Sequence, residues 1–63
     1  MSLYRCFLIN AENHIIEPAT EIEASHDDAA IAHARRLCEN RPECADVEVW
    51  CGAKRVGNVK PAA

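Results

Sequence analysis

The sequence lacks the features that mark membrane, secreted and nucleic-acid-binding proteins. No apolar stretch approaches the roughly 18 residues that span a bilayer. Residues 1–5 contain neither a basic segment nor an apolar run, so they predict no secretory signal. Outside residues 25–42, basic residues gather only at Lys54-Arg55 and Lys60, and the formal net charge is −3, which argues against contact with phosphate backbones. We therefore expect a cytoplasmic protein with neither nucleic-acid nor membrane partners.

The shortness of the chain sets a second limit. At 63 residues it predicts one small domain, which we place at residues 1–60, with a frayed C-terminus at 61–63. A core of this size leaves little net stability once conformational entropy is subtracted. A disulfide, a metal ion or oligomerisation is therefore expected to support the fold.

One amphipathic helix is predicted between Ser25 and Pro42. Ser25 and Asp28 match the Ser-x-x-Asp form of a capping box, with the Ser25 hydroxyl as the N-cap acceptor. Asn40 and Pro42 mark its end. Helical spacing places one apolar stripe on its buried side: Ala30, Ile31, Ala34, Leu37 and Cys38.

The other periodic segments read as strands, at about 3–9, 14–23, 45–51 and 55–59. Turns are expected at residues 10–13 and 52–53. Pro18 cannot donate to a strand ladder, so the second strand belongs at a sheet edge. The fold class predicted is a two-layer α+β domain with ββαββ order, in which one helix covers a four-stranded antiparallel sheet of order 2-1-3-4. Because successive side chains of a strand point to opposite faces, five side chains are predicted to lie beneath the helix: Tyr4, Cys6, Leu8, Val47 and Val49.

The opposite sheet face has no second helix to cover it. Parity places Phe7, Ile9 and Trp50 there, with Arg5 at the rim. An uncovered apolar group of this kind is typical of a protein interface. The sequence therefore predicts a non-enzymatic interaction module that forms a homodimer through this face or through strand edges. An unknown protein partner that adds a strand to an edge is a further prediction.

The four cysteines, Cys6, Cys38, Cys44 and Cys51, include no Cys-x-x-Cys pair of the kind that marks structural zinc sites. In a reducing compartment we expect free thiols that pack in the core. Two alternatives stay open. Cys38, Cys44 and His33 would form a metal or small-ligand site at the helix end, or Cys38 and Cys44 would form a disulfide.

No set of residues predicts catalysis or a bound cofactor. His33 and Cys38 would need a third, orienting residue to act as a nucleophilic pair, and none is evident. The acidic residues of the second strand are open to water, so nothing would separate their pKa values for acid–base work. We therefore assign no catalytic residue and expect no cofactor.

Four segments carry a resemblance to a known group of proteins: Tyr4-Arg5-Cys6-Phe7, Asp27-Asp28-Ala29-Ala30, Val47-Glu48-Val49-Trp50 and Gly52-Ala53-Lys54-Arg55-Val56. Together they resemble short proteobacterial proteins without an assigned function, which implies a small, soluble α+β domain and no active site. The strand-strand-helix beginning is also similar to HicB-type antitoxin domains, whose helix likewise opens with acidic residues. This chain lacks the Gly-rich, aromatic second strand of that family and has no DNA-binding segment.

Overall fold

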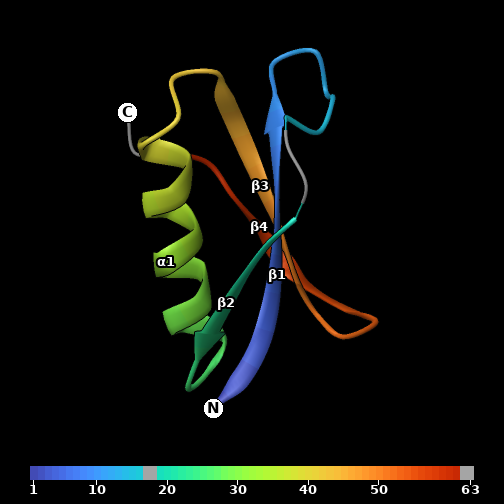
Figure 1. Ribbon diagram of the computed structural model, residues 1–63, viewed down its shortest axis with the longest axis vertical. Coiled ribbons are helices and arrows are strands. Elements are labelled where there is room, and N and C mark those ends of the chain that lie inside the picture. The colour runs from blue at the N-terminus through green and yellow to red at the C-terminus, as the bar shows by residue number, and fades with distance from the viewer. Residues whose placement is uncertain (17–18, 62–63) are drawn as a thin grey trace.

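The computed structural model describes residues 1–16 and 19–61. Four strands and one helix follow one another along this part of the chain: β1 (Ser2–Asn10), β2 (Thr20–Ala24), α1 (Asp27–Glu39), β3 (Cys44–Cys51) and β4 (Lys54–Val59). The strands form one antiparallel sheet in the order β2-β1-β3-β4, and α1 lies along one side of it (Figure 1). The predicted α+β fold and its strand order are confirmed.

Strand register decides which side chains share a face of the sheet. Residues directly opposite one another in antiparallel strands project to the same side. Arg5 lies opposite both Glu21 and Trp50, and Trp50 lies opposite Arg55. The face away from α1, which we name the open face, carries Leu3, Arg5, Phe7, Ile9, Glu21, Glu23, Asp46, Glu48, Trp50, Arg55 and Asn58. Within residues 1–16 and 19–61, no helix or further strand layer covers it (Figure 1).

The hydrophobic core lies between α1 and the other face of the sheet. The helix contributes Ala30, Ala34 and Cys38, which are almost fully buried, while Ile31 and Leu37 are half-buried at its margins. The short alanine side chains let the helix backbone lie close to the sheet. All five sheet residues predicted beneath the helix are at most 3% exposed: Tyr4, Cys6, Leu8, Val47 and Val49.

The start of α1 differs from the predicted capping box. The N-cap is His26, in extended conformation, and its ring Nδ1 accepts a hydrogen bond from the Ala29 amide at 3.2 Å. The prediction of Ser25 as the N-cap is therefore wrong by one residue, because an imidazole nitrogen replaces the hydroxyl as acceptor. The helix ends at the predicted Asn40, whose amide donates to Arg36 and Cys38 carbonyls. Within the described part of the chain, no helix is long and apolar enough to cross a membrane.

The connection between β1 and β2 is a tight turn followed by an irregular segment. The Asn10 side-chain oxygen accepts from the Glu12 and His14 amides, each at 3.0 Å, and Asn13 adopts a positive φ of 67°. Such a conformation suits asparagine. The chain then runs back beside β1 and forms a single bridge between Ile15 and Ile9.

The second strand is shorter than predicted. Regular pairing begins only at Thr20, so the strand expected over 14–23 is confirmed for its last part alone. The predicted edge position of β2 is confirmed by the strand order. Pro18, on which that prediction depended, lies outside the described residues.

The β3–β4 connection is the short turn predicted at residues 52–53. Cys51 pairs with Lys54, and Gly52 has a φ of 62°, which a side chain would disfavour. The pairing then shifts between Val49 and Trp50, which marks a bulge. Of the predicted frayed C-terminus at 61–63, residue 61 has no regular structure and residues 62–63 lie outside the described range.

Candidate interaction face

A shallow apolar groove lies on the open face. Its volume is about 320 Å³, and it is lined by Arg5, Phe7, Ile15, Glu48, Trp50 and Gly52. Three of the four residues predicted for the interface, Arg5, Phe7 and Trp50, therefore come together. The structure brings them from β1 and β3, the two central strands of the sheet.

Trp50 and Arg5, two of the residues that line the groove, each make a polar contact with a neighbouring carboxylate. The Trp50 indole N–H donates to Glu48 Oε1 at 3.2 Å, along the same strand. Arg5 Nε lies 3.5 Å from Glu21 Oε2, and both side chains are more than half exposed. An exposed pair of this kind contributes little to stability. Arg5 therefore keeps most of its hydrogen-bonding capacity for another molecule.

The fourth predicted residue, Ile9, is only 9% exposed. Its prediction as interface surface is corrected: the segment after the β1 turn runs back beside it, through the bridge to Ile15. Ile15 takes its place in the groove and is 59% exposed, and Leu3 on the same face is 52% exposed. Ile15 was not predicted because the residues of the strand expected over 14–23 were not assigned to either face of the sheet. The neighbouring apolar residue Ile16 packs against the core, and side chains of adjacent residues in an extended segment point to opposite sides.

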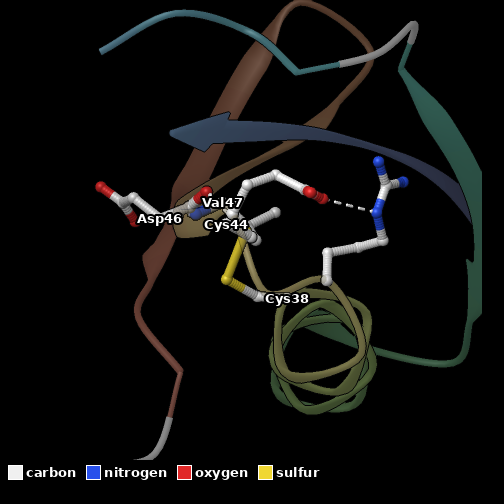
Figure 2. The surroundings of a disulfide bond; sticks show 6 residues. Cys38, Cys44, Asp46 and Val47 are labelled. Carbon is white, nitrogen blue, oxygen red and sulfur yellow. Dashed lines mark hydrogen bonds and ion pairs between the residues drawn. A yellow bond between two sulfur atoms is a disulfide. The ribbon is translucent and has the colours of Figure 1, made fainter. Parts of the chain in front are cut away.

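At the end of α1, where the alternative metal or small-ligand site was predicted, the structure contains a disulfide. Cys38 and Cys44 are bonded, with their Cα atoms 5.4 Å apart, and the bond runs from the last turn of α1 to the first residue of β3 (Figure 2). The expectation of free thiols is wrong for this pair, because the turn after α1 returns the chain to the helix. Sulfurs that are bonded to each other are not thiolate ligands for a metal.

His33, the third member of the alternative metal site, is exposed on α1. Within the residues that the structure describes, no group of three His, Cys, Asp or Glu side chains is arranged to hold a metal ion. The geometry therefore gives no support to a metal site built from His33, Cys38 and Cys44.

The remaining thiols are not placed as nucleophiles. Cys6 and Cys51 are free, but Cys6 is fully buried and its burial raises the pKa of the thiol. A raised pKa lowers the fraction of reactive thiolate. Cys51 is half-buried and packs against the margin of the core.

The pKa of Tyr4 is also strongly raised. Its hydroxyl donates to Asp27 Oδ1 at 2.8 Å, and this hydrogen bond, together with burial, raises the pKa of Tyr4 to about 12. A phenol with that pKa stays protonated at neutral pH. It therefore acts as a structural donor between β1 and α1 and not as a general base.

Comparisons with protein-family models, with curated proteins and with solved structures each find no match. The resemblances to short proteobacterial proteins and to HicB-type antitoxin domains stay predictions.

Proposed function

We propose that this protein is a non-enzymatic interaction module that self-associates through its open face. One observation carries the proposal: the uncovered side of the sheet holds an apolar groove at its centre, built from Phe7, Ile15 and Trp50. Aromatic side chains and arginine are enriched where proteins bind one another. Arg5 and Glu48 supply charges of both signs at the groove margin.

Self-association also meets the stability requirement of so short a chain. On the open face, Leu3 is 52% exposed and Phe7 and Trp50 are partly exposed, so this apolar surface of β1 and β3 has no cover within the described part of the chain. Burying it against a second copy would add hydrophobic stabilisation that the monomer lacks. The disulfide between Cys38 and Cys44 supplies another part of the support that a small core needs.

The compartment is part of the proposal. Disulfides persist in oxidising environments and are rare where glutathione keeps thiols reduced. The bond between Cys38 and Cys44 therefore supports an oxidising location over the cytoplasmic one expected from the sequence. Alkylation of the protein in lysed cells, before any reductant is added, reports the state of these two thiols directly.

Native mass spectrometry, performed without chelator across a range of protein concentrations, tests the proposal. We expect a dimer mass with nothing added, and a shift toward monomer in Phe7→Ala and Trp50→Ala. Arg35→Ala, at an exposed position on α1, is the matched control and should leave the dimer intact. A monomer at all concentrations would overturn the proposal. An added mass of a zinc ion or small molecule would favour a ligand-binding protein instead.

Trp50 gives a second readout because it is the chain's single tryptophan. Dimer formation should move its emission to shorter wavelength as concentration rises, since the indole leaves water. Circular dichroism of both groove variants checks that they keep the fold. A variant that unfolds is replaced by Phe7→Ser or Trp50→Phe.

A further inference from the structure

One row of side chains crosses the open face from edge to edge. Glu21 on β2 lies opposite Arg5 on β1, Arg5 lies opposite Trp50 on β3, and Trp50 lies opposite Arg55 on β4. From β2 to β4, the row therefore consists of a carboxylate, a guanidinium, an aromatic ring and a second guanidinium. The β2 edge of the row is negative, and the β4 edge is positive.

This row is complementary to its own reversed copy. Reversing the order places Glu21 against Arg55 at both ends and Arg5 against Trp50 at both central positions. The first pairing is an ion pair. The second places a guanidinium over an indole ring, which is the most favourable cation–π combination. Opposite charges or a cation and a ring thus meet at every position.

A two-fold axis that runs along the strands, between β1 and β3, produces this reversal. It stacks β2 over β4 and β1 over β3 of the second copy, with the strands of the two sheets aligned as in ordinary sheet packing. An axis across the strands through the same row would place Glu21 on Glu21, Arg5 on Arg5 and Arg55 on Arg55. Like charges would then face one another at three positions.

We infer that the partner on the open face is a second copy of this chain, related by the two-fold axis along the strands. Glu21 of each copy pairs with Arg55 of the other, and Arg5 of each stacks on Trp50 of the other. This inference rests on the proposed self-association and adds its orientation. The side chains are available: Arg5 and Glu21 are 61% and 53% exposed, and Arg55 is exposed.

The pair between Arg5 and Glu21 within one copy is compatible with this arrangement. Their atoms are 3.5 Å apart through one guanidinium nitrogen, Nε, and one carboxylate oxygen. Arginine carries five N–H donors and a planar face, and a carboxylate has two oxygens. Glu21 therefore has an oxygen left for Arg55 of the second copy.

Two charge reversals test the orientation. Arg55→Glu places Glu21 against a glutamate twice per dimer, and Glu21→Arg places an arginine against Arg55 twice. We expect each variant alone to weaken dimerisation by roughly tenfold or more at low salt. Mixed in equal amounts, the two variants should form a heterodimer, because both of its contacts then join opposite charges. Sedimentation velocity on the separate and mixed samples measures this.

Glu23→Arg, a charge reversal at an exposed position of the same strand and face but outside the row, is the matched control, and thermal melting of all variants checks their fold. Weakened dimers in both single variants, together with recovery on mixing, establish the orientation. An axis across the strands would also allow recovery on mixing, but it would leave the single variants no weaker than wild type. Failure of the mixture to recover, or unchanged dimers in the single variants, overturns it, and the proposed function still stands if Trp50→Ala abolishes the dimer. A wild-type protein that stays monomeric overturns both.

Discussion

The Tyr4 hydroxyl donates a hydrogen bond to Asp27 Oδ1 over 2.8 Å and so joins β1 to the first residue of α1. The disulfide between Cys38 and Cys44 joins the last turn of the same helix to β3. The two ends of α1 are therefore each fixed to a central strand of the sheet. Between them the helix contacts the sheet mainly through alanines, whose small side chains offer little apolar area.

The Tyr4–Asp27 contact predicts a pH-dependent loss of stability at high pH. The hydrogen bond to Asp27, together with burial and the charge of Asp27, raises the pKa of Tyr4 from 10.0 to about 12. A pKa raised in the folded state means that stability is fully present below the unfolded value. It is lost as pH rises from 10.0 through about 12. Ultraviolet absorbance of tyrosinate measures the midpoint, and Tyr4 is the chain's single tyrosine.

Asp27→Asn removes the carboxylate and should shift the Tyr4 midpoint back toward 10.0, although burial still raises it in part. Tyr4→Phe is the control for stability, because it removes only the hydroxyl and so isolates the contribution of the hydrogen bond to Asp27. The difference in unfolding free energy between wild type and Tyr4→Phe should shrink as pH rises. A wild-type midpoint at the ordinary tyrosine value would contradict the role given to Asp27.

Removing the disulfide should destabilise the domain strongly. Cross-linking over a separation of six positions restricts the unfolded chain by about 2 kcal/mol in the loop-entropy estimate. We expect Cys38→Ala with Cys44→Ala to lower the unfolding free energy by about that amount. Denaturant titration measures it. Reductant should lower the stability of wild type to the same level and leave the double variant unchanged.

Thiol counting gives the independent check. Under denaturing, non-reducing conditions an alkylating reagent should modify only Cys6 and Cys51, the two free thiols. All four cysteines should react after reduction. Modification of Cys38 and Cys44 without reductant would show that the bond is absent from the purified protein.

Periodicity was sufficient to predict the fold. The alternation in β3 and the single amphipathic helix define the layers, and the edge position of β2 then leaves one simple strand order. The core residues followed because parity assigns each strand residue to a face.

The N-cap of α1 was missed because imidazole is an uncommon N-cap acceptor, so the pattern favoured the hydroxyl of Ser25 over His26.

The residues that line the groove were predicted only in part, for a different physical reason. Arg5, Phe7 and Trp50 lie on regular strands, where parity is reliable. Ile9 is buried and Ile15 is exposed in the groove because the segment that contains Ile15 runs beside β1. No local sequence pattern specifies where such a segment lies. The disulfide depends on the path of the turn between Cys38 and Cys44. Spacing alone permitted a thiol pair, a metal site or a disulfide.

The His26 cap predicts that a better acceptor will stabilise the protein. Asparagine is among the preferred N-cap residues, whereas histidine is not. His26→Asn should therefore raise the unfolding free energy by up to about 1 kcal/mol, and His26→Ala should lower it. Ser25→Ala is the matched control, since Ser25 does not cap the helix. If Ser25→Ala destabilised the protein more than His26→Ala, the cap would lie one residue earlier.

Close packing of α1 on the sheet predicts opposite results for two alanines of the same helix. Ala34 is 0% exposed and lies against the core, whereas Ala32 is exposed. Ala34→Leu forces extra methyl groups into a filled space and should lower the unfolding free energy by about 1 to 3 kcal/mol. Ala32→Leu should change it by no more than about 0.5 kcal/mol. Because leucine and alanine have similar helix propensities, the difference between the two variants isolates packing. Equal effects in thermal denaturation would mean that α1 does not lie as closely on β1 and β3 as the burial of Ala34 indicates.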